Sequence, residues 1–355
     1  MTFAFKNIVK RVGAETHIYD TTVEFVENEF NILLGTTLAG KTTLLQLMAG
    51  LEVPTSGEIW FNGKNVTGVA TQKRNVSMVH QQFINYPHFS VYDNIASPLR
   101  VAGVPRNEVE ARVGRVADLL KMTPMLKRRP SELSGGQQQR TALARALVKD
   151  AELVLLDEPL ANLDYKLREE LRDELPKLLS DRQCTVIYAT TEPTEALLLG
   201  GHTATIHEGR VTQFGKTPDV YRQPADLETA RVFSDPPMNT TRITRKDGRM
   251  ILSDDVSWAA AGPAQNLPDG SYMMGIRPHF VTVQPTGDNA IPIKGRVIVS
   301  ELSGSESVVH FELASLSWVS QSHGIHDISI GAEATFYLDT SHCIYFDENE
   351  QLMAA

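Results

Sequence analysis

The feature that most limits how this chain can fold is an octapeptide matching GxxxxGK[ST]. It lies between a short apolar run at residues 30–34 and a helical apolar pattern at residues 41–49, and Gly50 is placed to end that helix. In such a strand–loop–helix unit, backbone N–H groups of the loop and the helix N-terminus point at phosphate oxygens. The motif and the residue after it predict a nucleotide-phosphate site at Gly35, Thr36, Thr37, Leu38, Ala39, Gly40, Lys41, Thr42 and Thr43.

Four side chains in and beyond this loop predict the chemistry. Lys41 supplies a positive charge for the β and γ phosphates, and the Thr42 hydroxyl is a ligand for Mg²⁺. Asp157 ends a second apolar run and is followed by Glu158, so the first carboxylate is expected to hold Mg²⁺ and the second to activate water. Alone, such a pair is more often a solvated strand end, but the upstream phosphate loop favours the catalytic role.

Apolar runs alternate with helical patterns over the first two thirds of the chain, which is typical of an α/β sheet domain. The runs at 153–156 and 185–188 fit strands buried on both faces, and Glu208-Gly209 is flanked like a hairpin turn. After Asp235-Pro236-Pro237, short alternating segments follow instead. We therefore predict an α/β domain at residues 1–235 and a small β domain, a barrel by pattern, at residues 236–355.

Composition excludes several classes of protein. A formal net charge of -9 disfavours a nucleic-acid partner. Cys184 and Cys343 lie far apart and outside any CxxC or Cys/His cluster, so we expect a reducing compartment with neither disulfide nor zinc. The N-terminal residues do not resemble a secretory signal, and no apolar stretch approaches the roughly 18 residues that span a bilayer. Other subunits would have to provide any membrane span.

Residues 133–137, Leu-Ser-Gly-Gly-Gln, resemble the signature motif of ABC-type ATPases. Ser134 is placed to cap a helix, and the two glycines present N–H donors at the positive end of its dipole. The resemblance implies that the donors meet a γ-phosphate held by a second subunit. The residues concerned are Ser134, Gly135, Gly136 and Gln137.

Two further positions match this family in the same order. Gln81 stands where the family has its Q-loop glutamine, which senses Mg²⁺ and water and reports to the transmembrane subunits. Residues 160–164 look like the D-loop, with Asp164 crossing the dimer interface. The resemblance implies ATP and Mg²⁺ as cofactors. It also implies a P-loop ABC ATPase domain with a RecA-like core sheet and a helical subdomain.

The remaining chain is similar to maltose-type sugar importer ATPases, which carry an all-β OB/TOBE-like domain after the ATPase domain. The segments 236–239, 275–278 and 295–297 carry this similarity, and Leu167-Arg168 after the D-loop suits the same branch. It implies a head-to-tail ATPase dimer, two permeases and an external solute-binding protein, at the cytoplasmic face of the inner membrane. Details of the phosphate loop and of residues 188–193 look most like glycerol-import ATPases. Other sugar or glycerol-phosphate importers stay open, because ATPase subunits do not bind the solute.

Two positions depart from the family. Thr191 stands in place of the switch histidine, just before Glu195-Ala196; it can donate a hydrogen bond but cannot carry imidazolium charge. Val12 stands in place of an aromatic residue that stacks on adenine, for which His17 and Tyr19 are nearby substitutes. We hypothesise that the chain pairs with a non-identical ATPase subunit. The site on this chain's own phosphate loop would then hydrolyse ATP slowly, and the partner's site, which uses this chain's signature motif, would be active. The rival is a homodimer in which Thr191 suffices.

Two other functions fit the sequence less well. A soluble ABC protein acting on nucleic acid or the ribosome usually has tandem nucleotide domains or coiled-coil arms, and neither is seen here. A regulator with vestigial hydrolysis is disfavoured by intact Lys41, Asp157 and Glu158. Export stays possible in principle, but the similarity of the C-terminal domain favours import.

Overall fold

A computed structural model of the chain describes residues 3–161, 163–180, 183–287, 290–313 and 315–355. It divides into two compact units, Met1–Thr217 and Pro218–Ala355. The boundary that we predict from motifs, at residue 235, lies further along. Apart from Thr217, the short helices α7 (Thr217–Arg222) and α8 (Leu227–Val232) fall in the second unit.

The central sheet of the first unit has six strands in the order β10-β9-β3-β8-β7-β6. All neighbours pair in parallel except β10 with β9. Every residue of β3, β7 and β8 is buried, which explains why these strands appear in the sequence as continuous apolar runs. The strands are β3 (Phe30–Leu34), β6 (Val76–Val79), β7 (Leu153–Asp157), β8 (Thr185–Thr190), β9 (His202–His207) and β10 (Arg210–Lys216).

A second, antiparallel sheet has the order β2-β1-β4-β5. Helix α1 (Lys41–Ala49) shares one apolar core with both sheets, and Gly50 ends it in the left-handed conformation, as expected. Phe3 and Phe5 anchor that core in an edge-to-face contact with ring centroids 5.4 Å apart. The strands are β1 (Phe3–Val12), β2 (Glu15–Phe25), β4 (Ser56–Phe61) and β5 (Lys64–Asn65).

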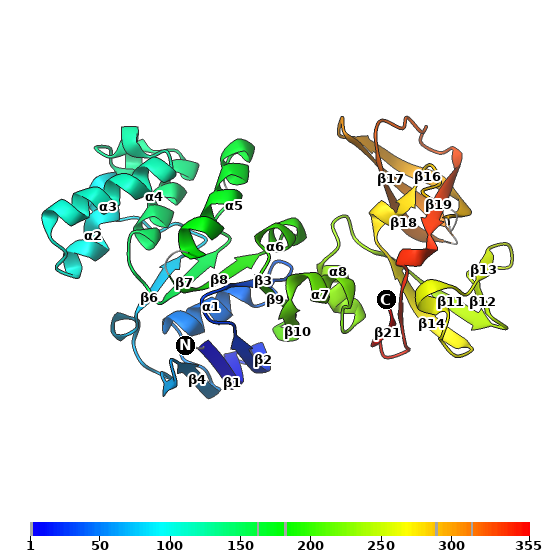
Figure 1. The fold of residues 1–355 in the computed structure, drawn as a ribbon, viewed down its shortest axis with the longest axis horizontal. Helices are drawn as coiled ribbons and strands as arrows, with labels where there is room; N and C mark the ends of the chain where they lie inside the picture. Colours follow the sequence, from blue (N-terminus) through cyan, green and yellow to red (C-terminus); the bar gives the residue numbers. More distant parts are fainter. Residues whose placement is uncertain (1–2, 162, 181–182, 288–289, 314) are drawn as a thin grey trace. The chain divides into compact units, whose positions relative to one another are not determined.

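Helices α2 (Val91–Val101), α3 (Arg106–Leu119) and α4 (Gly135–Leu147) form a helical subdomain. Figure 1 shows them together at one end of the first unit, away from α1. Helices α5 (Tyr165–Ser180) and α6 (Pro193–Leu199) follow β7 and β8 in the chain. The predicted ABC ATPase fold, with a core sheet and a helical subdomain, is confirmed. No helix in the described part of the chain combines the length and apolar composition of a membrane span.

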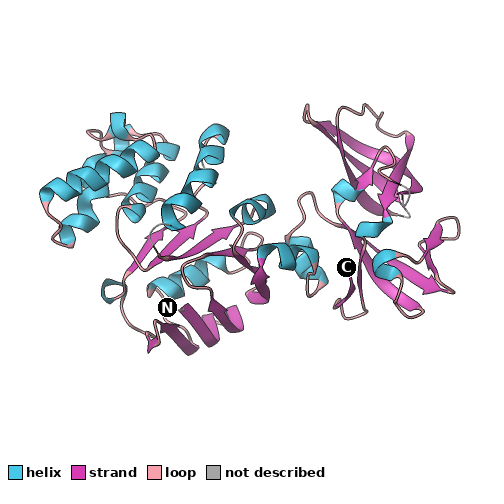
Figure 2. Ribbon diagram, viewed as in Figure 1, coloured by secondary structure: helices cyan, strands magenta, loops and turns pink. Residues whose placement is uncertain are grey.

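The second unit is built mainly of strands (Figure 2). They form antiparallel sheets in the orders β13-β12-β11-β14-β20-β21 and β15-β19-β16-β17-β18. Phe311 and Phe336 stack with centroids 3.8 Å apart in the core. The predicted all-β, OB/TOBE-like domain is confirmed, and its described strands make two antiparallel sheets. They are β11 (Asn239–Lys246), β12 (Arg249–Ile251), β13 (Ser257–Ala259), β14 (Gly270–Ile276), β15 (Val281–Thr282), β16 (Ala290–Leu302), β17 (Glu306–Leu313), β18 (Leu316–His323), β19 (Glu333–Asp339), β20 (Ile344–Phe346) and β21 (Leu352–Ala354).

Candidate functional site

The phosphate loop connects β3 to α1, as the motif predicts. Lys41 is the first residue of α1, is only 5% exposed, and its Nζ donates to Gly35 O at 2.8 Å and Thr36 O at 2.9 Å. Gly40 has φ 107, and a Cβ there would lie 2.8 Å from Ile18 Cδ1. The backbone conformation therefore favours glycine at this position, and a larger residue would also displace the Ile18 side chain.

Residues from much later in the chain hold the loop in place. The amide of Gly35 donates to Thr190 O at 3.4 Å, and the amide of Gly209 donates to Ala39 O at 2.9 Å. A Cβ added to Gly35 would lie 2.4 Å from the backbone oxygen of Ile206 on β9. The neighbouring strands β8 and β9 thus fix the loop's conformation.

We expect Gly35→Ala to destabilise the first unit by about 1–3 kcal/mol, since the added methyl overpacks a rigid backbone contact. The midpoint of chemical denaturation measures this. Gly114→Ala is the matched control, because nothing lies within 4 Å of a Cβ at Gly114 inside α3. That variant should be neutral or more stable, and equal stability of the two variants would contradict the steric argument.

Thr42 and Asp157 form the candidate Mg²⁺ site. The Thr42 hydroxyl donates to Asp157 Oδ2 at 2.9 Å, and Asp157 is 2% exposed. Burial raises the pKa of Asp157, against the opposing effect of the Thr42 hydrogen bond. Hydroxyl and carboxylate oxygens are ligands that suit Mg²⁺, which usually binds through one or two protein groups plus phosphates and water. No cluster of three or more His, Cys, Asp or Glu side chains suited to a metal occurs among the residues that the structure describes.

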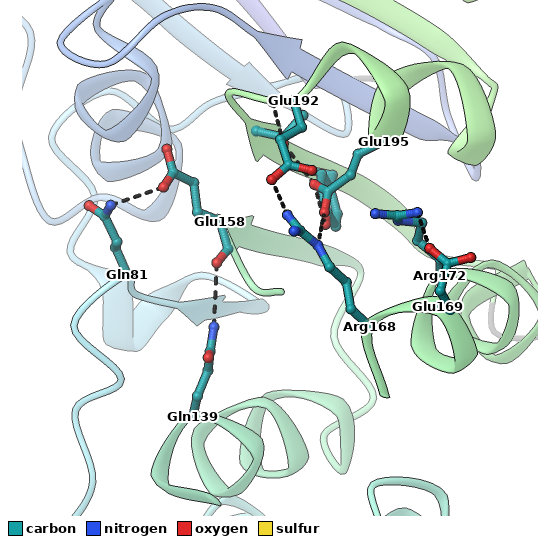
Figure 3. Close-up of polar contacts among 10 residues, drawn as sticks. Gln81, Gln139, Glu158, Arg168, Glu169, Arg172, Glu192 and Glu195 are labelled. Carbon is teal, nitrogen blue, oxygen red and sulfur yellow. Dashed lines mark hydrogen bonds and ion pairs between the residues drawn. The ribbon is translucent and has the colours of Figure 1, made fainter. Parts of the chain in front are cut away.

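Glu158 follows β7 in the left-handed conformation, with φ 47. Its Oε1 lies 3.7 Å from Lys41 Nζ, and its Oε2 accepts a hydrogen bond from Gln81 Nε2 at 3.0 Å (Figure 3). Burial lowers the pKa of Lys41, and the nearby carboxylates of Glu158 and Asp157 oppose that change. The structure thus brings together Gln81, Lys41, Asp157 and Glu158 from three separate segments of the chain.

Gln139 is a site residue that the sequence analysis missed. It lies on α4, is 2% exposed, and its Nε2 donates to Pro159 O at 2.8 Å and Glu158 O at 3.5 Å (Figure 3). It therefore holds the backbone at Glu158, where the left-handed conformation is strained. The run of three glutamines that ends at Gln139 carries the only signal, and it does not tell which glutamine faces inward.

The signature residues lie at the N-terminus of α4, away from the phosphate loop. Ser134 caps α4, accepting from Gln137 N at 3.4 Å while its own amide donates to Gln137 Oε1 at 3.0 Å. Ser134 and Gly135 are exposed, with Gly136 and Gln137 half-buried. Figure 1 shows α4 apart from α1, so the structure does not bring the signature to the phosphate loop of its own chain.

Three more predicted residues lie at exposed positions. Asp164 caps α5 by accepting from Leu167 N at 3.1 Å, and Thr191 follows β8. Asn162 of the D-loop lies outside the described residues. Val12 is 51% exposed and pairs with Glu15 at the tip of the β1–β2 hairpin. The roles of Asp164, Thr191 and Val12 stay predictions.

The alternatives to Val12 lie on β2. The backbone oxygen of His17 is 3.4 Å from the Cβ position of Gly40, which puts β2 beside the loop. The ring of Tyr19 is covered by the Arg210 guanidinium at 4.0 Å from its centroid. Tyr19 already has a stacking partner, so His17 is the more available of the two.

Comparison with known proteins identifies a family with the same motifs. Residues 18–161 match the family model described as ABC transporter. Over 360 residues the chain is 36% identical to the trehalose/maltose import ATP-binding protein MalK of Thermococcus litoralis, with 96% of each chain covered. The chain belongs to the ABC transporter ATP-binding family. It is therefore an ABC-type ATPase, as predicted.

Other proteins of this family also match the chain. The oligosaccharides import ATP-binding protein MsmX of Bacillus subtilis is 33% identical, with 95% of each chain covered. The sn-glycerol-3-phosphate import ATP-binding protein UgpC of Pectobacterium atrosepticum is 32% identical, over 93% of this chain and 92% of that one. A dimeric post-hydrolysis structure of the ATP-binding cassette MJ0796, bound to ADP and Pi, matches with a TM-score of 0.56 and 26% identity. It covers 61% of this chain and 98% of its own.

Proposed function

We propose that this ATPase energises an importer for a small polyol or carbohydrate, with glycerol the favoured solute. The observation that carries the proposal is the assembled group of Lys41, Thr42, Asp157 and Glu158. It occurs in a chain whose relatives over nearly its full length are import ATP-binding proteins. Those relatives differ in solute but are named for trehalose/maltose, oligosaccharides or sn-glycerol-3-phosphate.

The site residues divide the work. Lys41 and the loop amides bind phosphate oxygens, and Thr42 and Asp157 hold Mg²⁺, which neutralises charge on the phosphates when bound. Glu158 orients the attacking water and accepts its proton, and the Gln81 amide fixes the Glu158 carboxylate. These roles need a carboxylate beside the phosphate loop, and the contact between Lys41 and Glu158 provides it.

The signature of this chain completes a site on a second subunit. Its donors are exposed at the N-terminus of α4, where the helix dipole favours the negative γ-phosphate. Asp164 is exposed at the start of α5, as a residue at a head-to-tail dimer interface requires. Because Thr191 and Val12 depart from the family pattern, we propose a non-identical ATPase as the partner.

An exposed apolar surface beyond Gln81 fits a membrane partner. Ile84 is 58% exposed, Tyr86 50% and Phe89 44%, and the guanidinium of Arg145 lies 4.9 Å from the Tyr86 centroid. Apolar side chains gathered this way mark contact sites. We propose that one of the two permeases of the assembly contacts this surface at the cytoplasmic face of the inner membrane, and that an external binding protein delivers the solute.

Uptake by cells tests the solute. In a strain that lacks the gene, wild-type protein should restore uptake of labelled glycerol, and Lys41→Ala should not. Labelled maltose and glycerol 3-phosphate serve as competing solutes in the same cells. Restoration of maltose or glycerol 3-phosphate uptake alone would reject glycerol and retain the importer.

We expect Thr191→His to raise ATP hydrolysis by about tenfold, because an imidazole adds a charged donor near the γ-phosphate. Phosphate release by the chain together with its partner ATPase measures this. Thr194→His is the control, since Thr194 is exposed on α6. Fast hydrolysis by the chain alone, unchanged by Thr191→Ala, would instead support the homodimer.

A further inference from the structure

A buried carboxylate behind the switch position collects three hydrogen bonds. Glu195 is 2% exposed, and its Oε2 accepts from the Tyr188 hydroxyl at 3.0 Å and the Thr190 hydroxyl at 2.7 Å. Its Oε1 accepts from Arg168 Nε at 3.1 Å (Figure 3). Burial, and then the Glu195 charge, raise the pKa of Tyr188, so that its hydroxyl stays a donor. A carboxylate so deeply buried is stable only while these partners remain.

Arg168 carries the network to the D-loop. Its Nη2 binds Glu192, so one guanidinium bridges two carboxylates (Figure 3). Its backbone amide donates to Asp164 O at 3.0 Å in the first turn of α5. Arg168, which binds Glu192 beside Thr191, is therefore held one helical turn from Asp164.

The network holds both neighbours of Thr191. The Thr190 hydroxyl donates to Glu195 and accepts from the amide of Glu192 at 3.0 Å. The Glu192 side chain binds Arg168. A shift of Arg168 is therefore expected to move the segment around Thr191, because Arg168 binds Glu192 on one side of that residue and binds Glu195, the partner of Thr190, on the other.

We propose that Arg168 and Glu195 form a link that sets the positions of Thr191 and Asp164 together, and that Arg168 is a positioning residue for ATP hydrolysis. The proposal rests on the proposed function of the site. If Arg168 on α5 and Glu195 on α6 only stabilised the fold, they would not need to bind residues on both sides of the exposed Thr191. A planar guanidinium suits this task, because its fork reaches two acceptors at fixed geometry, whereas a lysine ammonium does not.

The test uses the full chain together with its partner ATPase and Mg-ATP. Arg168→Lys keeps the charge and loses the fork, and Arg168→Gln removes the charge. We expect kcat to fall about 10- to 100-fold with KM changed less than about twofold, as for misplaced catalytic groups. Amide hydrogen exchange should rise together in residues 188–195 and 163–168, which reports the link without requiring turnover.

Glu169→Gln is the matched control. It breaks the Glu169–Arg172 ion pair on the same helix and leaves the bonds of Arg168 in place. Normal kcat in Arg168→Gln, or equal losses in Glu169→Gln, would overturn the proposal. Increased exchange in only one of the two segments would also overturn it. If wild-type protein failed to hydrolyse Mg-ATP even with its partner ATPase, the proposed function would fall, and the exchange experiment would still decide the link.

Discussion

Replacing Lys41 with alanine is expected to reduce ATP hydrolysis by at least about 100-fold, the effect of losing one preorganised group that stabilises transition-state charge. The side chain is 5% exposed and stands at the start of α1, so no other cation of the described phosphate loop can replace it. Loss of its bonds to Gly35 and Thr36 should cost only about 1 kcal/mol each. The defect should therefore lie in phosphate binding and not in folding.

Thermal unfolding with and without Mg-ATP separates these effects. Saturating nucleotide at about 100 times Kd should stabilise wild-type protein by about 2.7 kcal/mol and Lys41→Ala much less. Lys64→Ala, an exposed lysine on β5, controls for loss of one positive charge. Unaltered stabilisation and turnover in Lys41→Ala would remove the phosphate loop from the proposed mechanism.

The second large effect is expected from Glu158→Gln, which should lower kcat by about 10²–10⁴, as the loss of a general base does. Nucleotide binding should persist, because Lys41 and Thr42 are untouched. A glutamine keeps the shape of the side chain and an acceptor for Gln81, so the left-handed backbone at this position is retained. Because ATP is then hydrolysed slowly, the ATP-bound dimer should accumulate.

Light scattering with ATP measures the trapped dimer, and single-turnover phosphate release measures the chemical step. Glu152→Gln is the control, since Glu152 is exposed at the opposite end of β7. Wild-type turnover in Glu158→Gln would show that Glu158 is not the base. A dimer that forms equally with ADP would contradict trapping by uncleaved ATP.

Local patterns predicted the fold well. Continuous apolar runs identified β3, β7 and β8, because a parallel strand buried on both faces needs apolar residues at every position. The turn at Glu208-Gly209 joins β9 to β10 as expected. The phosphate loop was found because its backbone geometry demands specific residues at fixed spacing.

Contacts made by side chains across the fold were harder to predict. Gln139 differs from its neighbouring glutamines only in the direction that its side chain faces. In the sequence, Arg168 marked only a family similarity and Glu195 only located Thr191, because nothing local records that a salt bridge joins α5 to α6. Such pairing depends on the assembled sheet, which no short window of sequence contains.

The way in which the phosphate loop is held has a consequence for synthesis on the ribosome. Strand β3, made early, lies between β8 and β9, and the loop's amides and carbonyls bond to Thr190 and Gly209. An emerging chain therefore cannot complete its nucleotide site until residue 209 has left the exit tunnel, and the edge of β3 that pairs with β9 stays unpaired until β9 has emerged. Nascent chains cut before β9 should fail to bind ATP and should need chaperones, whereas chains ending after β10 have all the partners of the loop.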